Sequence, residues 1–317
     1  MAYVLYNKPY NSPSDLVASL KSKKLNFLDE AAAEKILSQI SYYHFKIYLH
    51  PLLNPLSPDG KHYRDNEFFE DGVDLYRFDE ELRSIFFKAI ARIEVKLRSR
   101  LDHVLSSLSN SSFWYLDDQW FYTPNNNNYN IESIRSRINN EFSNTKEEYA
   151  KHYKSKYYND AHHNYKALPP FWIASELLSI GMISKIYNSM DYAYINSHPG
   201  APLNAMANEF GPSNFKTLCT WIRLLRDVRN RCAHHSRLWN ANLPAPTNIN
   251  SLLSILPLNN NRLYGALVVT HKMLLSLGIN NFNIYNEINQ IIGKYICVRP
   301  YLHSAGFPSN WHTDPFW

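Results

Sequence analysis

The chain has 317 residues, of which 45% are hydrophobic and 19% charged, a composition that describes a folded, soluble protein of one large or two modest domains. Glycine is scarce, at 9 residues, and this scarcity favours helices over a turn-rich β fold. The formal net charge of +5 is compatible with a nucleic-acid partner but does not require one.

Cysteine usage and hydropathy exclude several other classes. Cys219, Cys232 and Cys297 include no C-x-x-C pair, so we expect neither a disulfide scaffold nor a structural zinc site. No apolar run reaches the roughly 18 residues that span a bilayer, and the amino terminus lacks a signal-peptide pattern. We therefore expect a cytoplasmic protein with no membrane association.

Two helices are predicted within the first 40 residues. Ser12 precedes Pro13, as at many helix starts, and a second helix is expected over about 29–40. The segment I-S-Y-Y-H-F-K-I-Y at 40–48 follows; its rings either pack with their hydroxyls at the rim or form a stacking surface for RNA bases. Residues 51–66 contain three prolines and an Asp-Gly pair, which predict a loop or short hairpin and an internal boundary.

A long helix is predicted over 73–108, with a possible break near Tyr76. Glu94 and Arg98 are four residues apart and can pair on its surface. Basic residues on its polar side are either solvated or contact phosphates; they are Arg92, Lys96, Arg98 and Arg100.

The middle of the chain is predicted to contain a surface loop and two further helices. Residues 109–130 are rich in Ser, Asn and aromatic residues and contain a Pro-Asn-Asn-Asn-Asn run, so we expect a loop. A polar helix is expected over 131–158. An apolar helix begins near Pro169–Pro170, and Glu176 lies among its apolar residues.

The segment from about 215 to 235 is predicted to be an amphipathic helix. Its apolar stripe consists of Leu218, Trp221, Ile222, Leu225, Val228 and Cys232. At about 100° per residue, Arg229 falls within that stripe and His234 points away from it. A guanidinium on a packing face is costly unless it is paired, for example with Glu176, or faces a wet cleft. Asp227 is spaced to bridge Arg223 and Arg231.

The remaining chain is predicted to be a loop over 242–257 and helices over about 262–277 and 284–296. The aromatic tail from Gly306 to Trp317 is expected to pin the carboxyl terminus onto the body. We find no internal repeat and no glycine-rich phosphate loop.

Several segments resemble known families. The string R-N-x-C-A-H-H-S-R-L-W-N, from Arg229 to Asn240, is similar to the signature of the Abi family, the bacterial abortive-infection proteins of AbiD and AbiF type. Within it, Arg229 and His234 resemble the R-x4-6-H motif of HEPN ribonucleases. Four other blocks are similar to the Abi family: I-x-Y-Y-x-F-x-x-Y, Y-R-F-D-E-E-L-R with its continuation, P-P-F-W-x-x-x-E-L-L-S-x-G, and the aromatic tail.

The resemblance implies an all-α, HEPN-like helical bundle. We expect an N-terminal helical region at 1–66, a HEPN-like core at 67–240, and C-terminal helices and tail at 241–317 packed on that core. HEPN domains pair, so the single motif implies a homodimer with one composite cleft, and Arg229 would lie at the shared seam.

The resemblance also implies metal-independent RNA cleavage by 2′-hydroxyl attack, with no cofactor. In that reading His234 moves protons, Arg229 stabilises the phosphorane charge, and Asn230 orients the histidine or binds a phosphate oxygen. Further RNA-binding candidates are Arg226, Arg231, His235, Arg237 and Arg98. His235 departs from the minimal motif and can instead cap or pack.

Two alternatives stay open. Arg229 and His234 can belong to a salt-bridge network that only tightens the bundle. The chain can also be a non-catalytic RNA-binding module that forms a ribonucleoprotein with a small, structured noncoding RNA, in which its arginines supply affinity.

Overall fold

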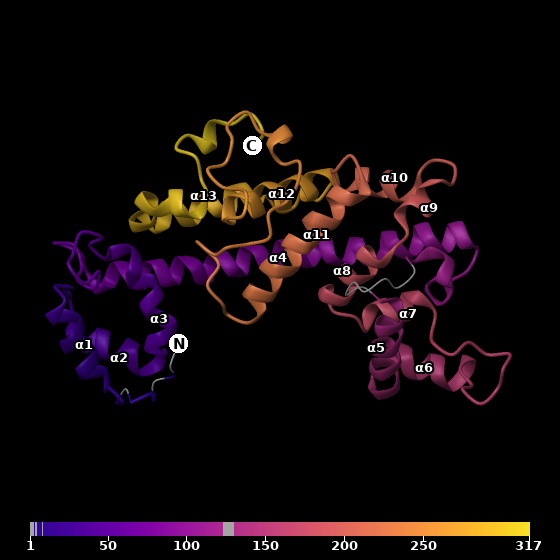
Figure 1. Ribbon diagram of the computed structural model, residues 1–317, viewed down its shortest axis with the longest axis horizontal. Coiled ribbons are helices and arrows are strands. Elements are labelled where there is room, and N and C mark those ends of the chain that lie inside the picture. The colour runs from indigo at the N-terminus through magenta and orange to yellow at the C-terminus, as the bar shows by residue number, and fades with distance from the viewer. Residues whose placement is uncertain (1–2, 4, 8, 123–129) are drawn as a thin grey trace. The chain divides into compact units, whose positions relative to one another are not determined.

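The computed structural model describes residues 3, 5–7, 9–122 and 130–317, and its regular structure is all-α (Figure 1). Within these residues there is no β-strand, only isolated bridges such as the one between Phe121 and Met190. The predicted all-α class is therefore confirmed.

The chain divides into two compact units. One consists of residues 1–82 with 289–302, and the other of residues 83–288 with 303–317. The sequence placed its boundaries at 66 and 240 instead, and that division into an N-terminal region, a core and C-terminal helices stays a prediction.

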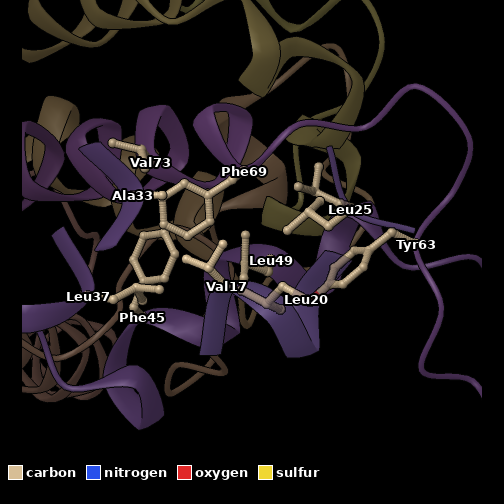
Figure 2. Close-up of a cluster of buried hydrophobic side chains, with 11 residues drawn as sticks. Val17, Leu20, Leu25, Ala33, Leu37, Phe45, Leu49, Tyr63, Phe69 and Val73 are labelled. Carbon is tan, nitrogen blue, oxygen red and sulfur yellow. The ribbon is translucent and has the colours of Figure 1, made fainter. Parts of the chain in front are cut away.

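The first unit contains α1 (Pro13–Ser22), α2 (Glu30–Gln39), α3 (Tyr42–Leu49), η1 (His50–Leu52) and the start of α4 (Phe69–Ser109). Ser12 caps α1 as predicted, because its Oγ accepts from the Asp15 amide while the Asp15 carboxylate accepts from the Ser12 amide. Side chains of the first three helices gather with Phe69 in an apolar cluster (Figure 2).

The tyrosine-rich segment of α3 mainly serves this unit's packing. Phe45 belongs to the apolar cluster, and buried Tyr48 donates its hydroxyl hydrogen to Asp79 at 2.7 Å. Tyr43, in contrast, is exposed. Residues 289–302 are tied to the same unit, since Tyr295 donates to Glu81 and Arg64 donates to the Tyr301 hydroxyl, each at 2.7 Å.

The second unit is built on the rest of α4, which runs from Phe69 to Ser109 without the break considered near Tyr76. Its buried side carries a nearly continuous apolar stripe whose side chains are fully buried: Phe86, Ile90, Ile93, Leu97 and Leu101. A continuous stripe of this kind needs no kink, because the helix can bury one face along its length.

Two segments predicted as single helices are each two helices. The polar segment forms α5 (Ile131–Asn144) and α6 (Glu148–Tyr157), since the chain turns at Thr145 to bring Tyr153 against Phe142. The apolar segment forms α7 (Phe171–Glu176) and α8 (Ile180–Ser189), because Ser179 is extended and caps α8 by accepting from the Met182 amide.

The predicted surface loop at 109–130 is wrong for its described part. This part contains η2 (Trp114–Leu116) and η3 (Asp118–Trp120), with Trp114, Tyr115 and Trp120 buried. Their large apolar rings gain more from burial than their polar neighbours lose. The predicted Pro-Asn run, at 124–128, lies outside the described residues.

The remaining elements of the second unit follow in chain order: α9 (Tyr192–Asn196), α10 (Pro202–Glu209), α11 (Phe215–Ala233), η4 (Asn250–Leu252), α12 (Leu263–Ser276), the first part of α13 (Ile284–Lys294), the end of η5 (Ile296–Ala305) and η6 (Trp311–Thr313). The aromatic tail packs as predicted: the Trp317 ring stacks on Tyr285 with centroids 5.1 Å apart and meets Tyr264 at 6.0 Å.

Candidate functional site

The signature segment folds as α11, close to its predicted bounds. Asn214 caps the helix by accepting from the Thr217 amide at 2.9 Å. The predicted apolar stripe is buried, and Trp221 fixes the helix to the following loop by donating from Nε1 to the Thr247 carbonyl at 2.9 Å. Helices α8, α10 and α12 pack against it (Figure 1).

Arg229 lies half-buried between α11 and α4. Its side chain is 31% exposed, and its Nε is 3.9 Å from Oε2 of Glu94. Its guanidinium carbon is 5.7 Å from the centroid of the Phe87 ring. The acidic partner is thus Glu94 rather than Glu176, which is exposed.

Glu94 is shared with a second arginine. Arg98 forms a close ion pair with the other Glu94 oxygen, as its four-residue spacing predicted, and it also donates to the Ser175 carbonyl, which ties α4 to α7. The side chains of Glu94 and Arg98 are only 11% and 13% exposed. Arg98, a predicted RNA contact, is therefore directed to protein acceptors.

This sharing leaves Arg229 incompletely neutralised. One carboxylate faces two guanidinium groups, and the closer contact goes to Arg98. Among the described residues no side chain or carbonyl accepts a hydrogen bond from Arg229. The guanidinium N–H groups of Arg229 therefore remain available to an oxyanion, and the guanidinium lies over the ring of Phe87.

His234 and Asn230 are exposed at the carboxyl-terminal end of α11. His234 is the C-cap residue, and its amide donates to the Asn230 carbonyl at 3.0 Å. In the part of the chain that the structure describes, neither side chain has a hydrogen-bond partner. No hydrogen bond between described residues joins the His234 side chain to Asn230 or to Arg229, and the roles predicted for Asn230, orienting the histidine or binding a phosphate oxygen, stay predictions.

His235 occupies a left-handed position just past the helix. Its φ is 53°, its amide donates to the Cys232 carbonyl at 3.3 Å, and the Ser236 amide donates to the Arg231 carbonyl at 2.9 Å. This is the Schellman arrangement, in which glycine usually takes the left-handed residue. The imidazole itself is exposed.

Arg231 holds the segment after the helix in place. Its Nε donates to Asp227 at 3.0 Å, and its two terminal nitrogens donate to the carbonyls of Arg237 and Asn242, each at 3.3 Å. The Asp227–Arg231 pairing is confirmed, but Asp227 does not bridge to Arg223, which is exposed. A structural role thus accounts for Arg231.

The other two predicted contacts are half-buried. Arg226 lies beside Gly181 in the first turn of α8. If Gly181 carried a Cβ, that atom would be 4.0 Å from the Cδ of Arg226. Arg237 is half-buried in the segment that Arg231 holds. The site therefore gathers Arg229 with Phe87, Glu94 and Arg98, and places His234 and Asn230 on the exposed end of the same helix.

Sequence reasoning missed Phe87 as part of the site, and it predicted Glu94 only as a partner of Arg98 and not of Arg229. A signal for Glu94 was present, since it is an acid between Ile93 and Leu97 on the buried side of a long amphipathic helix. Phe87 gave no such signal, because a large apolar residue beside the core stripe is ordinary and its 43% exposure depends on tertiary packing.

The described residues contain neither a candidate metal site nor a candidate membrane-spanning helix. No three His, Cys, Asp or Glu side chains within them gather as a metal site requires. None of the helices they form is long and apolar enough to cross a membrane.

Comparison with known proteins supports the resemblance. No curated protein and no solved structure matches the chain. The family model described as Abi-like protein matches residues 35–240. That range contains α11, the whole of α4, and every residue of the site. Because the match covers well over half of the 317 residues, the chain belongs to the Abi-like protein family.

Proposed function

We propose that this protein acts in phage defence by abortive infection, and that it binds and cuts RNA without a metal ion at a composite site between two copies. The role in defence follows the family name. The observation that carries the RNA chemistry is Arg229, a half-buried guanidinium with only a long ion pair to Glu94 and donors left for an oxyanion.

Arginine suits the charge that develops during cleavage. In this reaction the 2′-hydroxyl oxygen attacks the adjacent phosphorus, the bond from phosphorus to the 5′-oxygen breaks, and the products carry a 2′,3′-cyclic phosphate and a 5′-hydroxyl. The reaction passes through a phosphorane, whose oxygens carry more negative charge than those of the starting phosphodiester. A guanidinium stays protonated and matches two phosphate oxygens with parallel donors, so Arg229 stabilises that state.

Histidine suits the proton transfers. One group accepts the 2′-hydroxyl proton and another protonates the departing 5′-oxygen, and imidazoles exchange protons near neutral pH. His234 is exposed and has no described partner that would hold its ring nitrogens. One copy of the chain supplies one such histidine in this motif, whereas the reaction needs two groups.

The helix geometry favours a second copy. Five residues of α-helix separate Arg229 from His234 by about 140° around the axis, so the two side chains of one chain leave α11 on different sides. Beside Arg229, the exposed side of α4 presents an apolar line of Phe87, Ala91 and Val95. We propose that a second copy covers this line and brings its own His234 to the cleft.

The direct test incubates purified protein with total RNA in the presence of EDTA. We expect fragments with cyclic-phosphate ends that disappear in both Arg229→Ala and His234→Ala. Matched controls are Arg137→Ala on α5 and His103→Ala on α4, which remove an exposed arginine and an exposed histidine elsewhere. Equal loss of cleavage in the controls, or unchanged cleavage in the site variants, would reject the assignment.

A mixing experiment tests the composite site. Heterodimers of the Arg229→Ala and His234→Ala chains retain one arginine and one histidine at the seam. We expect them to regain a small part of the cleavage activity that each homodimer lacks, because one arginine and one histidine meet again and water takes over the second proton transfer. No recovery after verified subunit exchange counts against a shared cleft.

A second candidate is a non-catalytic module that forms a ribonucleoprotein with a small noncoding RNA. The observation that favours it is the absence of any described residue orienting the His234 ring, since proton transfer benefits from a held imidazole. This candidate predicts RNA in the protein as isolated, seen as a raised ratio of absorbance at 260 to 280 nm. It also predicts salt-sensitive binding without cleavage of any RNA offered.

A further inference from the structure

A pocket of about 240 Å³ opens beside the amino-terminal half of α11. Helix α11, the segment around α8 and α9, and the chain before residue 123 form its walls. Its lining is aromatic and polar: Tyr122, Tyr187, Asn188, Met190, Tyr192, Phe215, Lys216, Cys219, Thr220 and Arg223.

The floor of the pocket is held by packing and by a hydrogen bond. Tyr187 is fully buried, stacks on Phe215 with ring centroids 5.7 Å apart, and donates its hydroxyl hydrogen to the Leu97 carbonyl at 2.9 Å. Burial raises the pKa of the Cys219 thiol to about 12, so this sulfur stays protonated at neutral pH. A protonated thiol is neither a nucleophile nor a metal ligand, and the pocket is therefore suited to binding rather than chemistry.

The mouth carries rings and positive charge. Tyr122 and Tyr192 meet edge to face at 6.1 Å, and Tyr122 is 40% exposed. Lys216 places its Nζ 4.5 Å from the Tyr192 centroid, and Arg223 is exposed without an ion pair to any described residue. No described lining residue is acidic. This combination suits a nucleotide that is not base-paired. Its base can stack on the aromatic rings, and its phosphate can contact the cations.

The volume limits the occupant. Pockets for whole cofactors and drug-sized ligands hold roughly 300–1,000 Å³, so this one fits a single ring system and not a dinucleotide. A nucleobase satisfies that limit, with its phosphate left at the mouth.

The pocket and the end of α11 lie along one side of the helix. Lys216, Arg223, Asn230 and His234 are spaced by seven, seven and four residues, which puts them on one line, and all four are exposed. Asp227, near that line, has its carboxylate paired with Arg231. Eleven residues from Arg223 to His234 correspond to about 16 Å along the axis, a span that a short stretch of single-stranded RNA covers.

We infer that this pocket holds one unpaired base of the RNA that the proposed site cuts, with the adjoining phosphates on Lys216 and Arg223. The pocket then selects which phosphate reaches His234, because it fixes the strand a set distance away. The link to cutting rests on the proposed function, whereas the binding of a base does not.

The binding experiment uses the His234→Ala protein, so that the probe stays intact, and a random-sequence single-stranded RNA that contains 5-bromouridine. After irradiation we expect cross-linked peptides that contain Tyr122 or Tyr192. We expect Tyr192→Ala to weaken binding roughly 5- to 100-fold, the usual effect of losing one stacked base.

A charge-matched pair of double variants covers the case in which Tyr192→Ala disturbs α9. Lys216→Ser with Arg223→Ser removes two exposed cations at the pocket, and Lys151→Ser with Lys156→Ser removes two exposed cations on α6. For single strands each lost phosphate contact lowers the slope of log K against log salt by about 0.7, so we expect a reduction of about 1.4 for the pocket pair only.

The outcomes separate the two proposals. Cross-links confined to other surfaces, with equal salt slopes for both double variants, overturn the pocket inference even where wild-type protein cleaves RNA. Cross-links at the tyrosines with the predicted slope change support it even where no RNA is cut, and in that case the proposed cleavage fails alone. In cleaving protein, the pocket pair is expected to change which phosphates are cut, while the α6 pair leaves the pattern unchanged.

Discussion

The left-handed residue that ends α11 provides the sharpest test of how the signature segment is built. His235 has φ 53° and stands where the Schellman arrangement normally places glycine. Replacing it with glycine keeps both amide hydrogen bonds of the cap and removes the Cβ that makes the conformation costly.

The expected change follows from two opposing effects. The left-handed conformation costs an ordinary residue about 1–2 kcal/mol, and histidine tolerates it somewhat better than most. Glycine itself destabilises the folded state by about 0.5–1 kcal/mol, because its backbone has more conformational freedom to lose on folding. We therefore expect His235→Gly to stabilise the protein by about 0.5–1 kcal/mol. His235→Ala should lie close to wild type, and His235→Val about 1 kcal/mol or more below it, because a β-branched residue suffers most at positive φ.

Urea unfolding followed by circular dichroism measures the order of the three variants from their midpoints at unchanged m-value. A valine variant as stable as the glycine variant would show that the residue is not left-handed in solution. RNA binding is then measured on the same proteins. If the exposed imidazole contacts RNA, the more stable glycine variant binds RNA more weakly, which is the pattern of strain retained for function.

Three further predictions concern other parts of the second unit. Glu94→Gln removes the negative charge that Arg98 and Arg229 share. Because these groups are largely buried, we expect the free energy of unfolding, measured in urea, to fall by about 2–3 kcal/mol. A decrease below about 0.5 kcal/mol, typical of surface pairs, would contradict the observed burial. Burial lowers the pKa of His271 from 6.5 to about 4, so the folded state binds fewer protons than the unfolded state, and stability present above pH 6.5 is lost as pH falls towards 4. The melting temperature of His271→Gln should fall less over that interval than that of wild type, and parallel curves would rule His271 out as a cause. Val95→Glu places a charge on the exposed apolar line of α4, where we propose that a second copy binds. Light scattering should show a dimer for wild type and a monomer for Val95→Glu. A dimer unaffected by the change would place the interface elsewhere, and a monomeric wild type would reject the proposed dimer.

Local patterns were sufficient for the elements of this protein whose partners are near in sequence. The Ser12 capping box, the long α4 stripe and the Glu94–Arg98 pair each depend on residues within one or a few turns, and all were predictable. The two split helices were not. Periodicity in 131–158 continues through the turn at Thr145, and only the packing of Tyr153 on Phe142 requires the chain to reverse there.

The candidate site shows the same division. The amphipathic pattern of α11 placed Arg229 on the packing side and His234 away from it, because side-chain direction along a helix is fixed by its 3.6-residue period. Ion pairs between two helices depend on which helix faces pack together. The local spacing of residues in the sequence does not predict that packing. The carboxylate opposite Arg229 is therefore Glu94 and not Glu176, which only the packing of α11 against α4 decides. For the same reason the aromatic pocket beside Arg223, which is drawn from three separate segments, becomes visible only in the tertiary structure.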